Sequence, residues 1–221
     1  MISILHPSRS RPERAAATAR KWLDNAGCDV EYILSIDIDD PKRDQYPNTA
    51  LISDNRSAID AINHAAEKAT GNILMVLSDD FDCPPLWGKQ ILDVTKGKTD
   101  WILKTPDGIQ DWIITMPIMD RAYYERFQYI YYPAYLHMFC DTELSCVADL
   151  TGRLLHADIR FTHNHYSTGK GQKDEISDRA DKTWTQGEKL FLTRFRQNFD
   201  LKETPGKITN QNYLNWIKSK L

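Results

Sequence analysis

Three aspartates follow a short run of apolar residues in the first half of the chain. Residues 73–77 read Ile-Leu-Met-Val-Leu, and Asp79, Asp80 and Asp82 come within the next five positions. A short apolar run of this kind is typical of a buried strand, whose end is a fixed platform. Carboxylates crowded there repel one another, and a hard divalent cation relieves that repulsion. The pattern predicts a metal site with Asp80 and Asp82 as ligands, although a solvated helix cap before Pro84 would use the same residue type.

A second acidic cluster, Asp37, Asp39 and Asp40, follows the strand expected at residues 30–38. In an open α/β sheet, ligands bind at the carboxyl ends of the strands. The cluster could therefore hold a nucleobase, a ribose or a metal beside the first cluster. It could equally be an acidic loop closed by Pro41.

Two arginines lie in the turn after the first expected strand, at residues 1–5. Arg9 and Arg11 stand near Pro7 and the start of the helix expected to follow. A helix N-terminus favours anions, and the guanidinium group matches phosphate oxygens. The turn is therefore a candidate phosphate site, with an ordinary surface pair of arginines as the alternative. Arg56, just before the next expected helix, is a further candidate for binding the same ligand.

Two later segments carry groups that could complete a site. Asp141 and Glu143 are flanked by apolar residues. A carboxylate facing the site could act as a general base, and acidic residues are also favoured at helix N-termini. His163 and His165 are two residues apart, so on a strand their side chains point the same way. Imidazole is a frequent metal ligand, which makes this pair a candidate for the metal site.

The hydrophobic pattern places these residues on alternating strands and helices. After the strand at 1–5, Ser10 and Glu13 have the spacing of a capping box for the first helix. The β-α-β-α-β-α series predicts an α/β fold with a mostly parallel central sheet flanked by helices. Its strands are expected at 1–5, 30–38 and 73–77, and its helices at 10–26, 57–69 and 84–94.

The second half of the chain predicts a less regular arrangement. Further strands are expected at 101–104, 112–116 and 159–162, and helices at 184–199 and near the C-terminus. The simplest organisation is one α/β domain at residues 1–170, with a helical extension at 171–221 packed on the same domain.

The composition excludes some classes of function. The 221 residues carry a formal net charge of −3, which is not typical of a general nucleic-acid-binding protein. No apolar run approaches the roughly 20 residues of a transmembrane helix. The N-terminal segment places its apolar residues before its arginines, the reverse of a secretory signal. Four cysteines without a Cys-x-x-Cys pair predict reduced thiols, so we expect a cytoplasmic protein.

Taken in order, these motifs resemble glycosyltransferase family 2, whose members have the GT-A fold. The resemblance covers about residues 1–166, and Cys140 stands where the family's late acidic motif has its first glutamate. The matching residues are Pro7, Arg11-Pro12-Glu13, Asp39-Asp40, Asn63, Gly71, the segment 78–82, Asp141-Thr142-Glu143-Leu144 and the pair His163 and His165.

The resemblance implies an inverting glycosyltransferase that uses a nucleotide-sugar donor, often a UDP-sugar, with Mn²⁺ or Mg²⁺. A metal that bridges the donor diphosphate stabilises the leaving group. The general base is then Asp141, with Glu143 as the alternative. The implied metal ligands are Asp80, Asp82, His163 and His165, and the implied donor contacts are Pro7, Arg9, Arg11, Asp37, Asp39, Asp40, Arg56, Asp79 and Asp80.

Two other functions stay open on the sequence. A nucleotidyltransferase would also use a carboxylate-bound metal, but it typically has a glycine-rich first turn, and this first turn has no glycine. A binding module could keep a nucleotide-sugar pocket without catalysis. The acceptor of a transferase is also open: a glycan, a lipid-linked sugar, a protein or a hydroxylated DNA base.

Overall fold

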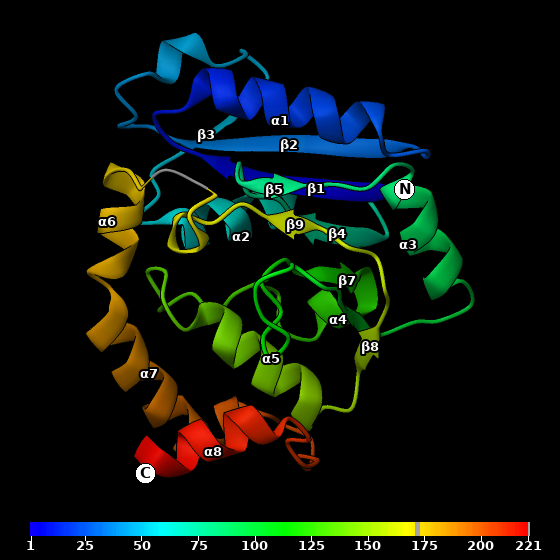
Figure 1. Ribbon diagram of the computed structural model, residues 1–221, viewed down its shortest axis with the longest axis vertical. Coiled ribbons are helices and arrows are strands. Elements are labelled where there is room, and N and C mark those ends of the chain that lie inside the picture. Colours follow the sequence, from blue (N-terminus) through cyan, green and yellow to red (C-terminus); the bar gives the residue numbers. More distant parts are fainter. Residues whose placement is uncertain (171–172, 221) are drawn as a thin grey trace.

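The computed structural model describes residues 1–170 and 173–220, and its centre is a seven-stranded sheet (Figure 1). The strands lie in the order β3-β2-β1-β4-β7-β6-β8. Neighbours are parallel, except that β7 runs antiparallel to β4 and β6, so the expected mostly parallel sheet is confirmed. The bounds are β1 (Ile2–Ser8), β2 (Val30–Asp37), β3 (Leu51–Ser53), β4 (Ile73–Val76), β6 (Ile102–Lys104), β7 (Ile118–Asp120) and β8 (Leu154–His156).

Eight helices of the described residues surround this sheet. Figure 1 shows α1 at one end of the molecule, while α6, α7 and α8 run down one side and across the opposite end. No helix within the described ranges is both long enough and apolar enough to cross a membrane. The helices are α1 (Pro12–Asp24), α2 (Ala58–Lys68), α3 (Trp87–Thr95), α4 (Arg121–Glu125), α5 (Cys140–Leu150), α6 (Glu175–Asp181), α7 (Trp184–Arg196) and α8 (Gln211–Lys220).

The apolar run at residues 73–77 is buried on both faces of the sheet. Met75 belongs to one buried cluster with Trp22 of α1, and Leu74 belongs to another with Ile59 of α2. Successive strand residues point to opposite faces, so a strand that is apolar throughout needs cover on both sides. This packing makes the carboxyl end of β4 the rigid platform from which the three aspartates follow.

The first two helices begin in different ways. Ser57 caps α2, because its hydroxyl accepts the backbone N–H of Ile59 at 3.2 Å. The capping box expected for Ser10 and Glu13 is wrong, since α1 has no side-chain cap. Ser10 instead has a φ of 60°, and its backbone N–H donates to Asp40 at 2.8 Å. The turn after β1 is therefore fastened to the loop after β2.

The prediction of a strand at residues 112–116 is wrong. The neighbouring strand of the structure is β7, which begins at Ile118. The segment at 112–116 is a loop whose backbone N–H groups bond to side chains outside it. The amide oxygen of Gln110 accepts the N–H groups of Trp112 and Ile113 at 2.7 and 2.8 Å. The Ser145 hydroxyl accepts that of Ile114 at 2.8 Å. These hydrogen bonds satisfy backbone groups that a strand would have paired.

A second, two-stranded sheet lies beside the central one. β5 (Phe81–Asp82) pairs antiparallel with β9 (Thr162–His163), which is shorter than the strand expected at 159–162. The pairing sets Phe81 opposite His163, and their rings stack with centroids 4.1 Å apart. Segments about eighty residues apart in sequence are thus held side by side.

The C-terminal helices complete the core around α5. Arg194 of α7 forms a buried ion pair with Glu143 at 2.8 Å, and the Tyr213 hydroxyl of α8 donates to the carbonyl of Thr142 at 3.1 Å. The expected division into residues 1–170 and an extension falls at a position outside the described residues. The packing itself joins α7 and α8 to the rest of the protein.

Asn63 links α2 to the loop that follows α4. Its side-chain amide donates to the carbonyl of Tyr131 at 2.8 Å, and its oxygen accepts the N–H groups of Ile130 and Tyr131 at 2.9 and 3.2 Å. The side chain is buried, so no solvent replaces these bonds. The amide therefore satisfies three buried backbone groups at once.

We expect Asn63→Ala to lower the free energy of unfolding by about 3 kcal/mol, because it leaves those backbone groups without partners. Urea unfolding followed by circular dichroism measures this change. Asn212→Ala, at an exposed position of α8, is the matched control and should stay within about 0.5 kcal/mol of wild type. Equal stabilities of the two variants would contradict this role of Asn63.

Candidate functional site

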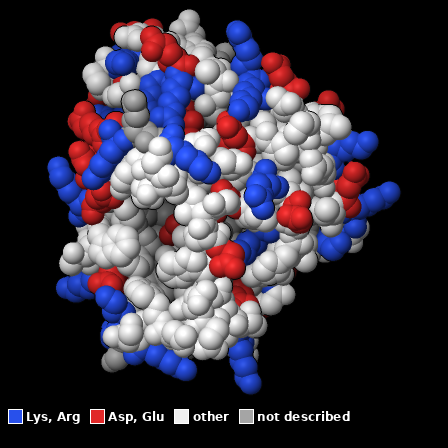
Figure 2. Space-filling model, viewed as in Figure 1, with Lys and Arg blue, Asp and Glu red and all other residues white. Residues whose placement is uncertain are grey.

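A cavity of about 570 Å³ lies at the carboxyl ends of β1 and β4. Figure 2 shows the molecule from the same side as Figure 1, with a hollow left of centre and Lys and Arg side chains gathered above it. The wall is formed by the turn after β1, the end of β4, the residues entering α5, the segment after β9 and the C-terminal helices. This is the edge of an α/β sheet at which ligands bind.

Asp80 lines this cavity together with both histidines of the His-x-His pair. The Ser78 hydroxyl donates to its carboxylate at 2.6 Å, and His163 Nε2 lies 3.2 Å from the other oxygen. Burial alone would raise the pKa of Asp80, but the hydrogen bond and charge of His163, with Ser78, hold that pKa well below its ordinary value. Asp80 is therefore an anion that faces the cavity.

His165 stands beside His163, with ring centroids 5.1 Å apart. Burial lowers the pKa of His165, and the neighbouring imidazole lowers it further. A neutral imidazole is the form that binds a metal. Carboxylate donors suit Mn²⁺ and Mg²⁺, and imidazole is a ligand of first-row transition metals.

The protein groups alone do not make a complete metal site. Within residues 1–170 and 173–220, no three His, Cys, Asp or Glu side chains are grouped as metal ligands. Asp80 with one of the two histidines would leave most positions around a cation open, so its remaining ligands would have to come from a bound molecule. Phosphate oxygens are ligands of this kind.

The structure does not bring Asp82 to the cavity. Phe81 points inward from β5, so strand alternation turns Asp82 to the other side, where it pairs with Lys21 of α1. Its side chain is 48% exposed. The Asp-x-Asp spacing thus contributes one carboxylate to the cavity, from Asp80.

Asp79 is also turned away from the cavity, into a buried network that the sequence did not predict. His6 Nε2 lies 2.9 Å from one carboxylate oxygen, and the Ser8 hydroxyl donates to the other at 3.3 Å. The second His6 nitrogen contacts the Tyr32 hydroxyl at 2.7 Å. The one available signal was a histidine inside the apolar first strand.

Of the two arginines predicted in the first turn, one lines the cavity and the other does not. Arg11 lines the cavity, pairs with Asp174, and lies 4.0 Å from the Asp79 carboxylate. Arg14 lines it as well and donates to the Asp79 carbonyl at 3.1 Å. Sequence reasoning missed Arg14, although its place one helical turn after Arg11 was a usable signal. Pro7 is the second predicted residue of this region, after Arg11, that reaches the cavity.

Arg9 does not reach the cavity. It donates to Asp37 at 2.7 Å and to Asp39 at 3.2 Å, and its hydrogen bond to Asp39 is the main reason that its pKa is raised. Asp40 accepts the N–H groups of Ser10 and Lys42, each at 2.8 Å. The acidic cluster after β2 therefore stands beside the cavity and fixes the neighbouring loops.

Arg56 is likewise placed outside the cavity wall. It pairs with Asp60 at 2.7 Å and donates to the carbonyl of Pro133 at 2.9 Å. Its side chain is 61% exposed. The structure therefore gives it a surface contact between α2 and the loop before α5.

The two candidate bases lie two residues apart on α5 and face different surroundings. Asp141 lines the cavity and accepts the N–H of Thr142 at 2.7 Å. Burial raises its pKa despite these hydrogen bonds. Glu143 instead binds Arg194 at 2.8 Å and accepts the Tyr135 hydroxyl at 2.8 Å.

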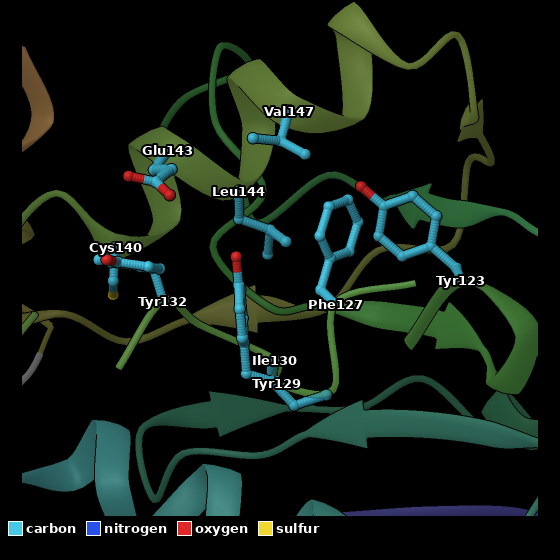
Figure 3. Close-up of a pocket in the computed structure, with 9 residues that line it drawn as sticks. All are labelled: Tyr123, Phe127, Tyr129, Ile130, Tyr132, Cys140, Glu143, Leu144 and Val147. Atoms are coloured by element: carbon cyan, nitrogen blue, oxygen red, sulfur yellow. The ribbon is translucent and has the colours of Figure 1, made fainter. Parts of the chain in front are cut away.

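Figure 3 shows the surroundings of Glu143. Its α5 neighbours Leu144 and Val147 point toward the aromatic side chains of the preceding segment. The enclosed space there is only about 20 Å³. Arg194 also stacks over the Tyr132 ring at 3.3 Å. Glu143 is therefore part of a packed ion pair, and Asp141 is the carboxylate of α5 that faces the cavity.

Solved structures share this architecture. The mannosyltransferase PcManGT of Pyrobaculum calidifontis, in complex with GDP-Man and Mn²⁺, has a TM-score of 0.54 and 11% identity over 98% of this chain and 83% of that one. Glucosyl-3-phosphoglycerate synthase of Mycobacterium tuberculosis, in complex with Mn²⁺, UDP and phosphoglyceric acid, has a TM-score of 0.56. Its sequence identity is 10%, over 83% of this chain and 76% of the synthase. The chain has a GT-A fold.

A third GT-A structure extends beyond this chain. TarS 1–349 of S. aureus, in complex with UDP, has a TM-score of 0.55 and 12% identity over 72% of this chain. The match spans 59% of TarS 1–349 and 37% of the longer TarS structure. No protein-family model and no curated protein sequence matches the chain.

The two α5 carboxylates should differ in stability measurements. We expect Glu143→Gln to cost about 3 kcal/mol, because it leaves the buried Arg194 without its main counter-charge. Asp141→Asn should leave stability unchanged or higher at pH 7. Burial raises the pKa of both carboxyls, so the difference rests on the partner: Glu143 holds the buried Arg194, and among the described residues no cation pairs with Asp141. Chemical denaturation at pH 7 measures the free energy of unfolding of both variants. A larger loss in Asp141→Asn than in Glu143→Gln would contradict the role of Glu143 in the buried ion pair.

Proposed function

We propose that this protein is a metal-dependent, inverting glycosyltransferase that moves a sugar from a nucleotide-sugar, with UDP as the expected nucleotide, to an acceptor hydroxyl. The observation that carries the proposal is the convergence of Asp80, His163 and Asp141 on one cavity from three separate segments. The GT-A fold and the Mn²⁺ and nucleotide complexes of its structural neighbours support it.

The donor diphosphate would lie between Arg11 and Arg14 on one side and Asp80 on the other. Asp80, with His163 or His165, would hold Mn²⁺ or Mg²⁺, which supplies positive charge to the leaving diphosphate when bound. The nucleoside would extend toward the carboxyl end of β2. Arg56, Asp79 and the residues Arg9, Asp37, Asp39 and Asp40 would then shape that side of the site from outside the cavity wall.

Asp141 would act as the general base. It would take the proton of the acceptor hydroxyl while the acceptor oxygen bonds to the anomeric carbon. The bond from that carbon to the diphosphate oxygen breaks, and its electron pair leaves with the diphosphate. Attack from the side opposite the leaving group inverts the anomeric configuration. Arg11 and Arg14 would stabilise the charge that accumulates on the departing group.

The four cysteines support a reducing compartment such as the cytoplasm. All four are free thiols, two of them buried. Disulfides are rare where glutathione and thioredoxin keep thiols reduced. The proposed location therefore agrees with the absence of any disulfide among these four residues.

The metal assignment is tested by melting temperatures with UDP or GDP, each with and without Mn²⁺. A ligand that binds the native state raises its melting temperature. We expect a nucleotide-dependent rise that Mn²⁺ increases, and Asp80→Asn should remove the Mn²⁺-dependent part. Asp82→Asn is the matched control, because that carboxylate pairs with Lys21 away from the cavity. Loss of the Mn²⁺ effect in Asp82→Asn alone would sink the assignment.

The base assignment predicts a pH profile. The pKa of Asp141 is raised above its ordinary value of 3.8. A base must be ionised, so activity is present above this raised pKa and is lost as the pH falls through it. Asp141→Asn should slow turnover about a hundredfold or more and abolish this acid limb. The assay uses the nucleotide-sugar that gives the largest thermal shift. Turnover near the wild-type rate would place the base elsewhere.

A further inference from the structure

The C-terminal helices add two tryptophans, Trp184 and Trp216, to the aromatic residues that line the cavity. Ile176 of α6, Trp184 of α7 and Trp216 of α8 line it together with Trp112 and Phe139. Phe139 is two residues before Asp141, so this wall adjoins the proposed base. An acceptor that presents its hydroxyl to Asp141 would therefore meet these side chains.

Trp184 has an open ring surface, unlike the other tryptophan of these helices. Trp216 is enclosed by Phe139 and Phe191, with ring centroids 5.6 Å from each. Trp184 contacts Phe139 edge-on at 5.1 Å, its one aromatic neighbour among the described residues. Its side chain is 54% exposed, although it belongs to the cavity wall. The indole is thus available to stack on a ligand.

The charges of the wall select against an anionic acceptor. Among the described lining residues, Arg11 and Arg14 are the permanent cations, and each has a partner: Arg11 pairs with Asp174, and Arg14 donates to the Asp79 carbonyl. Asp141 and Asp181 add negative charge to the same cavity. Lys173 pairs with Asp181 at 2.8 Å but does not itself line the wall. A phosphorylated acceptor would find no free cation beside the aromatic residues.

We propose that the acceptor is a neutral sugar whose apolar ring face stacks on Trp184, a proposal that rests on the proposed transferase function. A pyranose has a face of C–H groups and a rim of hydroxyls. An aromatic wall beside a carboxylate matches both parts, because ligand pockets combine apolar area with a few placed polar groups. Trp184 is then the residue that sets acceptor specificity, while the first turn holds the donor.

The experiment presents the full chain with candidate acceptors while UDP-sugar and Mn²⁺ are present. The candidates are methyl glucoside, methyl galactoside, methyl mannoside, the 6-phosphates of the same sugars, and a single-stranded oligodeoxynucleotide. We expect transfer to at least one neutral glycoside. Trp184→Ala should raise the acceptor KM about tenfold with a much smaller change in kcat, and Trp184→Phe should restore most of the loss.

The matched control is Leu92→Ala, at an exposed apolar position of α3 outside the cavity wall, which should leave the acceptor KM unchanged. An unchanged KM in Trp184→Ala, or transfer confined to the phosphorylated sugars or the oligonucleotide, would overturn the acceptor proposal. The thermal shift with UDP and Mn²⁺ separates the two proposals. Without nucleotide binding the transferase function itself falls, whereas binding without transfer to any neutral sugar removes the acceptor proposal alone.

Discussion

The antiparallel pairing of β5 with β9 places the Asp80 carboxylate next to the His163 imidazole. The N–H of Asn164 donates to the carbonyl of Asp80 at 2.8 Å, and Phe81 stacks on His163 at 4.1 Å. β5 and β9 have only two residues each, and a pairing that short would be unstable alone. Buried aromatic stacking and the rigid end of β4 hold the pairing in place. Without it, Asp80 and His163 would be on unrelated loops.

The C-terminal helices have a comparable role on the other wall. The ion pair of Glu143 with Arg194 is buried, and Arg194 also binds Asp200 at 2.8 Å and stacks on Tyr132. Removing charges from water is costly, so such a pair persists only when its remaining hydrogen bonds are satisfied. Here it fixes α7 against α5, and Trp184 lies at the start of α7. The same contact therefore positions the aromatic wall relative to Asp141.

The sequence predicted the elements governed by local periodicity and missed those governed by distant contacts. The strand at 73–77 and the helix capped by Ser57 follow from patterns within a few residues. The loop at 112–116 has an apolar pattern like a strand, but Gln110 accepts the N–H groups of Trp112 and Ile113, and the distant Ser145 accepts that of Ile114. Asp141 and Glu143 look equivalent in sequence. Only Arg194, fifty-one positions beyond Glu143, distinguishes them.

The three aspartates after β4 show why spacing overstates the number of metal ligands. Each carboxylate has its own partner: His6 for Asp79, His163 for Asp80 and Lys21 for Asp82. The repulsion expected of a crowded cluster is therefore relieved by separation, before any cation binds. Asp79 and Asp80 are each paired with a histidine, but of these two pairs only Asp80 and His163 line the cavity. In the proposed metal site, this pair would supply one carboxylate and one imidazole from segments about eighty residues apart.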